Sequence, residues 1–189
     1  MKVINYPLKK DWKQILERPT KKVDDIEDIV NSVFTEVQQN GDKAIAKYTQ
    51  KFDGVALENT IVSETEIKEA VNLVSIELKE AIKIAKANIE AFHKVQKTEK
   101  VFLETTNGVE CWQEKRPITK VGLYIPGGTA PLFSTVLMLS IPAQIAGCKE
   151  IVLCSPPNSK GKIHPAILYT ANLCGVTKIV KVGGIQAIA

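Results

Sequence analysis

The sequence predicts an α/β protein: an N-terminal helical region with a β-hairpin, followed by an incomplete Rossmann-like β-α-β-α-β parallel sheet. Two patterns predict this fold class. Over residues 1–120 the apolar side chains recur every three or four positions, as they do on amphipathic helices. Over residues 121–189 short apolar runs alternate with helical stretches, as strands and crossover helices do in a parallel sheet. These two ranges are the predicted domains.

Two amphipathic helices are predicted first. The first has its apolar face over residues 26–37 and ends at Asn40-Gly41, because Asn and Gly accept the left-handed conformation that closes a helix. Asp42 is expected to cap the second helix, which ends near Asp53-Gly54. The apolar positions on the helical faces are Ile26, Ile29, Val30, Val33 and Val37, then Ala44, Ile45 and Tyr48.

A single long helix is predicted next. Ser63 and Glu66 have the spacing of a capping box, which opens a helix. An apolar stripe then recurs at helical spacing as far as Phe92, and we interpret it as core packing rather than as a cofactor contact. His93 lies beside the stripe and is interpreted as a surface or packing histidine.

A β-hairpin is predicted at VFLETTNGVECWQ, residues 101–113. Asn107-Gly108 between two short extended runs suits a type I′ turn.

The second region is predicted to alternate strand and helix. Strands are expected at 121–125, 150–154 and 178–182, with helices from about Pro131 and over 164–174. Pro142 falls inside the first helical stretch, so a kink or two short helices are expected there.

The final residues, IQAIA, are predicted to begin another helix after Gly183-Gly184. An isolated turn of helix is unstable, and a three-stranded sheet would expose an apolar edge. We therefore expect either that residues follow Ala189 or that another chain covers this edge.

Composition narrows the functional classes. Hydrophobic residues make up 44% of the chain, no apolar run approaches a membrane span of about 20 residues, and no signal-peptide pattern opens the chain, so we expect a cytoplasmic protein without a membrane partner. Residues 121–189 carry five lysines and one acid, Glu150, which favours a phosphorylated ligand. Nucleic acid is a weaker option, because the lysines do not cluster and aromatic residues are few.

The cysteines and histidines do not suggest a metal centre. Cys111, Cys148, Cys154 and Cys174 lack CxxC spacing and are expected to be reduced. No cluster of four zinc ligands is visible, so no metal ligand is expected within this chain. Ser134 has no assignable His/Asp partners, and no catalytic residue is expected here either.

The loop PGGTAP after the first strand differs from the dinucleotide fingerprint G-x-G-x-x-G. Glu150 opens the second strand, whereas the acid that binds a ribose belongs at that strand's end. A plain tight turn is one interpretation. The other is a ligand site, because Gly127-Gly128 and Gly183-Gly184 both follow strands and would meet at the carboxyl edge of one sheet.

Tyr124 and Gln186 flank these two turns. A tyrosine ring can stack on a base or nicotinamide, and a glutamine amide can hydrogen-bond it. The alternative is structural: a tyrosine packed at the sheet edge and a glutamine that caps a helix.

Three stretches resemble the histidinol dehydrogenase family: NGDKAIAKYTQKFDG, VGLYIPGGTAPLFSTVLMLSIPAQIAGCKEIVLCSPP and LCGVTKIVKVGGIQAIA. The resemblance covers about residues 25–189 and corresponds to the N-terminal part of the enzyme. It implies oxidation of L-histidinol through histidinaldehyde to L-histidine, the last steps of histidine biosynthesis, with two NAD⁺ and a bound Zn²⁺. It also implies a homodimer whose active sites take residues from both subunits.

Carried over by motif, Tyr124 and Gln186 match family NAD⁺ contacts, and Pro126 in the same loop is a weaker candidate. Ser134 is a loosely held candidate for the substrate pocket. The family's zinc ligands and its catalytic Glu-His pair lie downstream and have no counterpart here. The resemblance therefore implies a chain that is inactive alone. The alternative is a short non-catalytic module that binds a nucleotide or a partner.

Overall fold

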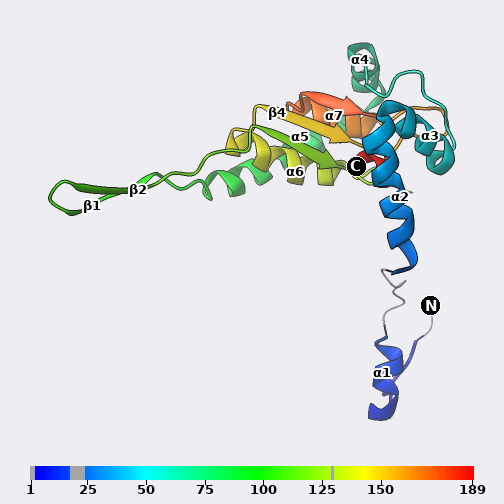
Figure 1. Cartoon of the computed structure of the whole chain (residues 1–189), viewed down its shortest axis with the longest axis horizontal. Helices are drawn as coiled ribbons and strands as arrows, with labels where there is room; N and C mark the ends of the chain where they lie inside the picture. The colour runs from blue at the N-terminus through cyan, green and yellow to red at the C-terminus, as the bar shows by residue number, and fades with distance from the viewer. Residues whose placement is uncertain (1–2, 18–23, 129) are drawn as a thin grey trace.

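The computed structural model describes residues 3–17, 24–128 and 130–189, and it confirms the predicted α/β class (Figure 1). The helices are α1 (Trp12–Ile15), α2 (Asp24–Asn40), α3 (Asp42–Asp53), α4 (Glu64–Leu73), α5 (Ile76–Lys94), α6 (Phe133–Ala146) and α7 (Pro165–Leu173), with 3-10 turns η1 (Lys9–Asp11) and η2 (Ile185–Ala187). The strands are β1 (Val101–Thr106), β2 (Val109–Gln113), β3 (Lys120–Tyr124), β4 (Glu150–Cys154) and β5 (Lys178–Val180).

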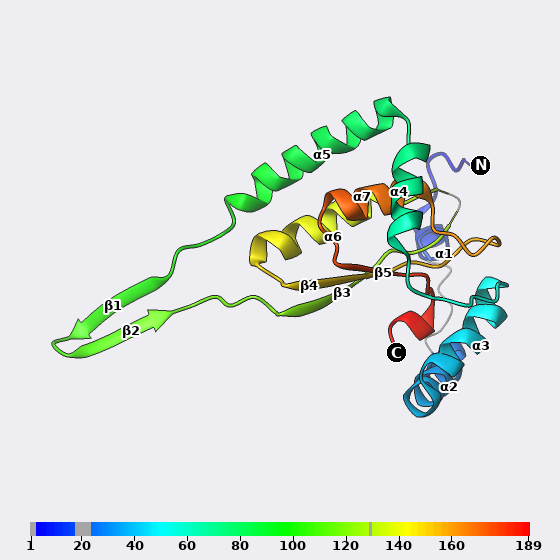
Figure 2. The ribbon, with the colours of Figure 1, turned by 90° about the horizontal axis from the view of Figure 1, so that it is seen from above.

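A three-stranded parallel sheet in the order β3-β4-β5 forms the centre of the molecule. Leu123, Leu153 and Ile179 align across it. Helices α4 to α7 lie on one side of the sheet, with α6 packed on α5 and α7 packed on α4 (Figure 2). The main core therefore joins side chains from both predicted regions, since Val62 and Ala70 pack with Ile125 and Leu153.

Helices α2 and α3 pair around Val33, Ala44 and Tyr48, which are buried together. Gly41 separates the two helices with a φ of +52°. The prediction that Asp42 caps α3 is wrong, because Gly41 occupies the cap position and Asp42 lies in the first turn of the helix. Gly54 closes α3 in the left-handed conformation, as predicted.

The predicted long helix is two helices. The capping box at Ser63 and Glu66 is confirmed and opens α4, but the chain becomes extended at Val74 and restarts at α5. Ser75 causes the restart, because its hydroxyl accepts from the Leu78 N–H and caps α5. The apolar stripe does pack in the core through Val74 and Ile82, whereas Phe92 is exposed.

The β1-β2 hairpin forms where the sequence places it, with Phe102 opposite Trp112. Its turn differs from the expected one. A type I′ turn needs a positive φ at both central residues, and only Gly108 has one, at +81°. The strand pairing also shifts between Glu104 and Thr106, so an irregularity lies next to the turn.

The outer edge of β5 is covered by the chain itself, so the expectation of an exposed edge is wrong on this side. Ile61 forms an antiparallel bridge with Val180. The Val62 N–H donates to the Ile179 carbonyl at 2.9 Å, and the Lys181 N–H donates to the Thr60 carbonyl at 2.6 Å. The segment before α4 thus satisfies backbone groups that the third strand would otherwise leave unpaired.

Three smaller features complete the fold. Helix α6 continues as one helix through Pro142 rather than splitting in two. The turn after Gly184 is the 3-10 turn η2, which packs on α2 and α3. No helix among the described residues is both long enough and apolar enough to cross a bilayer.

Candidate functional site

A cleft of about 570 Å³ opens at the carboxyl edge of the sheet, at the C-terminal ends of β3 and β4. This is the edge at which open α/β sheets bind their ligands, and the volume is in the range of small-molecule sites. Four prolines and two glycines are among its lining residues, together with a few polar groups. The lining residues include Asp53, Pro126, Gly128, Ser155, Asn158, Lys162 and His164.

The two predicted glycine turns converge on one residue, Pro156, in the loop after β4. A Cβ atom at Gly127 would lie 2.6 Å from the Pro156 Cγ. A Cβ atom at Gly183 would lie 2.9 Å from the Pro156 Cα and closer still to its ring. Real Cβ atoms do not approach other heavy atoms this closely, so glycine at both positions is what lets the three loops pack against one another.

Tyr124, the last residue of β3, ties the first glycine turn to the second. Its hydroxyl accepts a hydrogen bond from the Gly184 N–H at 3.0 Å, across 60 positions of sequence. Gly184 has a φ of +60°, a conformation that side-chain-bearing residues rarely adopt. The tyrosine is half-buried and is not one of the residues that line the cleft.

Gln186 is only 2% exposed, and its amide joins η2 to the end of α3. The amide Nε2 donates to the Asp53 carboxylate at 3.4 Å, a long hydrogen bond. The amide oxygen has no hydrogen-bond partner among the described residues. Burial raises the pKa of Asp53, because the carboxylate loses part of its hydration where it faces the cleft.

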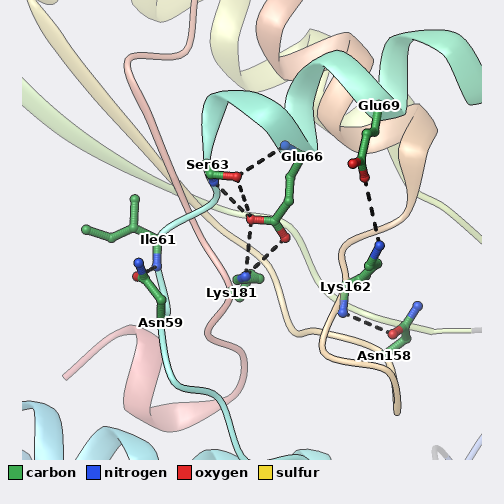
Figure 3. Close-up of polar contacts among 8 residues, drawn as sticks. All are labelled: Asn59, Ile61, Ser63, Glu66, Glu69, Asn158, Lys162 and Lys181. Carbon is green, nitrogen blue, oxygen red and sulfur yellow. Dashed lines mark hydrogen bonds and ion pairs between the residues drawn. The ribbon is translucent and has the colours of Figure 1, made fainter.

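Lys181 anchors the loop that follows β5 (Figure 3). Its ammonium donates to the Glu66 carboxylate at 3.1 Å, and this carboxylate also accepts from the Ser63 N–H at 3.0 Å. Desolvation raises the pKa of Glu66, but the Ser63 N–H and the Lys181 ammonium outweigh it, and the pKa lies below its usual value. The capping box of α4 therefore also fixes the loop that carries Gly183 and Gly184.

The predicted site residues do not all occupy the cleft. Pro126 lines it and is exposed. Tyr124 and Gln186 lie next to it, each engaged in a hydrogen bond with the protein. Ser134 is exposed on the first turn of α6 and is not among the lining residues. His164 lines the cleft and caps α7, with its Nδ1 accepting from the Ala166 N–H at 3.2 Å.

Sequence reasoning missed Asp53 and the pair of Glu66 and Lys181 as parts of this edge. Asp53 was visible only as the residue before a helix-closing glycine, and Glu66 only as half of a capping box. Both side chains contact residues more than 100 positions away, at Gln186 and Lys181. A local pattern carries no signal of such contacts.

The residues present fit a nucleotide better than a metal ion. The cleft offers glycine backbone, apolar proline walls and the Lys162 ammonium, which suit a sugar-phosphate ligand. Among the residues that the structure describes, no group of three or more His, Cys, Asp or Glu side chains is placed to hold a metal ion. No chemical step is therefore assigned to a metal in this chain.

Comparison with known proteins identifies relatives along the whole chain. The family model for histidinol dehydrogenase matches residues 16–189. The histidinol dehydrogenase of Bacteroides fragilis is 54% identical over 189 residues, which are 100% of this chain and 44% of that protein. The enzyme of Pasteurella multocida is 53% identical over 174 residues, covering 92% of this chain and 40% of the relative.

A solved structure agrees with the sequence matches. The crystal structure of histidinol dehydrogenase from Elizabethkingia anophelis superposes with a TM-score of 0.87 and 55% identity, over 96% of this chain and 42% of that one. The chain thus spans less than half the length of the relatives that it matches, at their N-terminal part. It belongs to the histidinol dehydrogenase family.

Proposed function

We propose that this chain supplies the NAD⁺-binding sheet edge of a histidinol dehydrogenase. The reaction would be the oxidation of L-histidinol through histidinaldehyde to L-histidine, the last steps of histidine biosynthesis, with two NAD⁺ as hydride acceptors. One observation carries the proposal: both glycine turns pack on Pro156 beside a 570 Å³ cleft at the carboxyl edge of a parallel sheet, in a chain of this family.

Pro126, Tyr124 and Gln186 are the residues that we assign to NAD⁺ binding. Pro126 forms an apolar wall of the cleft, on which a flat ring can rest. The Tyr124 hydroxyl holds the Gly184 N–H and so positions the second glycine turn relative to the first. The Gln186 amide oxygen is buried and lacks a partner within the described residues, and we assign it as an acceptor for an amide or amino group of the dinucleotide.

Zinc and the acid–base residues enter this proposal only as parts of a longer enzyme. The donor set for a zinc ion is not found among the described residues, so its ligands are assigned to the portion of the relatives beyond this match. The role of this chain is then to bind and orient the dinucleotide. We place the enzyme in the cytoplasm as a homodimer, with L-histidinol as its substrate and with neither nucleic acid nor membrane as a partner.

A chimera tests the proposed activity. The chain is joined to the unmatched remainder of the Bacteroides fragilis enzyme, and the production of NADH from histidinol is measured. We expect turnover with two NADH formed per histidinol. Tyr124→Ala in the chimera is expected to raise the KM for NAD⁺ about tenfold, with the zinc content unchanged. A loss of zinc, or an unchanged KM, would remove Tyr124 from the NAD⁺ site.

The unextended chain separates the enzyme from the non-catalytic alternative. Titrated alone with NAD⁺ and followed by saturation-transfer NMR, it is expected to show weak contacts that Pro126→Ala reduces. A chimera without turnover, combined with NAD⁺ binding by the chain alone, would favour a nucleotide-binding module. An absence of NAD⁺ binding in both the chimera and the unextended chain would reject the nucleotide site.

A further inference from the structure

Asp53 brings a carboxylate to the cleft from outside the sheet. It is the last residue of α3, and Gly54 after it closes the helix. The same cleft is lined by Ser155 and Pro156, which follow the end of β4. In a dinucleotide-binding sheet the end of the second strand carries the acid that binds a ribose, and this chain has Cys154 and Ser155 there. The structure thus places a carboxylate of another element in the cleft where the fingerprint lacks one.

The fold itself stabilises the Asp53 carboxylate poorly. The hydrogen bond from the Gln186 amide, at 3.4 Å, is longer than an ordinary one. Burial raises the pKa of Asp53, and no cation among the described residues offsets the lost hydration. The side chain also lies at the C-terminal end of α3, where the helix dipole disfavours a negative charge. A neutral side chain would therefore suit the fold better at this position, so the charge needs another explanation.

Lys162 supplies the opposite charge in the same cleft. It lies in the loop before α7 and is among the lining residues. Its ammonium pairs with Glu69 at 3.9 Å in an exposed contact, so it is available to a phosphate. The diphosphate of a dinucleotide needs cations or N–H donors, whereas its ribose hydroxyls donate hydrogen bonds and need acceptors. One ammonium and one carboxylate in a single cleft match these two parts of a dinucleotide.

We propose that the Asp53 carboxylate accepts hydrogen bonds from the 2′- and 3′-hydroxyls of the adenosine ribose and thereby selects NAD⁺ over NADP⁺. This inference rests on the NAD⁺ site proposed above and adds the residue that decides which dinucleotide the site accepts. In NADP⁺ the 2′-hydroxyl carries a phosphate group. That phosphate has no proton to donate to a carboxylate at neutral pH, and the negative charge of Asp53 repels it.

The position of the cleft assigns Asp53 to the adenosine ribose rather than to the nicotinamide ribose. β3 and β4 are the first two strands of the parallel sheet, and the cleft opens at their C-terminal ends. In this class of sheet the same place holds the acid or the arginine that distinguishes NAD from NADP. Asp53 is held there by η2, which packs on α3 and whose Gln186 amide donates to the carboxylate.

Binding of three dinucleotides to the chain itself tests the proposal. NAD⁺, NADP⁺ and the analogue of NAD⁺ that lacks the adenosine 2′-hydroxyl are titrated by NMR, and their Kd values are compared. We expect the natural chain to bind NAD⁺ at least about tenfold more tightly than either of the other two. In Asp53→Asn this preference should shrink to about twofold, because the charge is lost. The asparagine retains an oxygen that can accept from the Gln186 amide. Asp42→Asn, an exposed acid in the first turn of the same helix, is the matched control and should keep the natural preference.

Each other outcome rejects the ribose contact in a recognisable way. An unchanged preference in Asp53→Asn would reject it while leaving the NAD⁺ site in place. An equal loss of affinity for all three dinucleotides would make Asp53 a structural part of the site. The same change in Asp42→Asn would assign the effect to net charge. A natural chain that binds none of the three would reject the contact in this chain, and the chimera then decides whether the proposed NAD⁺ site fails with it.

Discussion

Two regions of this chain are opposite kinds of structure: the β1-β2 hairpin, called the arm here, and the carboxyl edge of the sheet. The arm is a local element whose two strands contact mainly each other and whose side chains lie in solvent. The edge is made from segments far apart in sequence, as the contact of Tyr124 with Gly184 and that of Gln186 with Asp53 demonstrate. The arm can therefore change without disturbing the fold, whereas the edge cannot.

This difference separates two ways of building a functional surface. At the edge, the loops are fixed by close backbone packing on Pro156, so the candidate site has its shape without a ligand. In the arm, by contrast, the charged and apolar side chains lie in solvent. Substitutions at the edge should therefore cost more stability than substitutions in the arm.

Gly183→Ala should cause the largest loss of stability. The added Cβ would collide with both the ring and the Cα of Pro156, and a backbone neighbour cannot move aside cheaply. We expect a loss of about 3 kcal/mol in the free energy of unfolding, at the upper end of the range for overpacking. Urea denaturation measures it. The matched control is Gly122→Ala in β3, where an added Cβ meets no atom within 4 Å and the change should stay below about 0.5 kcal/mol.

Lys181→Met should have the second-largest effect on stability. We expect a loss of about 2 kcal/mol in the free energy of unfolding, because the substitution leaves the half-buried Glu66 carboxylate without its cation. Lys162→Met is the control, since Lys162 and Glu69 form an exposed pair at 3.9 Å and should matter little (Figure 3). Equal effects from the two substitutions would contradict the view that the Lys181 contact anchors the edge.

The Lys181–Glu66 pair also predicts that the stability of the fold depends on pH. The pKa of Glu66 is lowered in the folded chain, so its stabilising contribution is fully present above its unfolded pKa of about 4.3. That contribution is lost as the pH falls through the lowered folded pKa. The difference in unfolding free energy between the natural chain and Lys181→Met should therefore shrink between pH 7 and pH 3.

The sequence predicts the local elements well and the edge poorly, for one physical reason. Capping at Ser63, helix closure at Gly54 and the hairpin around Gly108 depend on neighbours within a few residues, and all three are present. The break at Val74 was missed because the apolar stripe continues through it, and a single serine cap decides where the second helix starts.

The coverage of β5 by residues 60–62 was not predictable, because it pairs segments more than 100 positions apart. The doubled glycine turns did predict that two loops meet at one edge. They gave no indication that Pro156 would lie between them, since proline after a strand is equally consistent with a plain turn. Tertiary contact, rather than local preference, determines the geometry of the candidate site.

Asp53→Asn should have a smaller effect and of the opposite sign. Burial raises the pKa of Asp53, so the carboxylate destabilises the fold increasingly as the pH rises from about 3.9 through the raised folded pKa. The asparagine should be more stable than the natural chain at pH 7, by less than about 1 kcal/mol, and equal to it at pH 3. Urea denaturation at both pH values tests the sign. A gain would indicate that the edge retains a carboxylate at the expense of stability, as binding sites do.

Trp112→Ser should have the smallest effect on the folded monomer. The ring is 60% exposed, with Lys100 as a cation–π partner at 5.7 Å and Phe102 as its cross-strand neighbour. We expect the free energy of unfolding to change by less than about 0.5 kcal/mol at concentrations at which the chain is monomeric. Urea denaturation measures this change. A large loss would mean that the arm contributes to the core, and the contrast between the two regions would then be wrong.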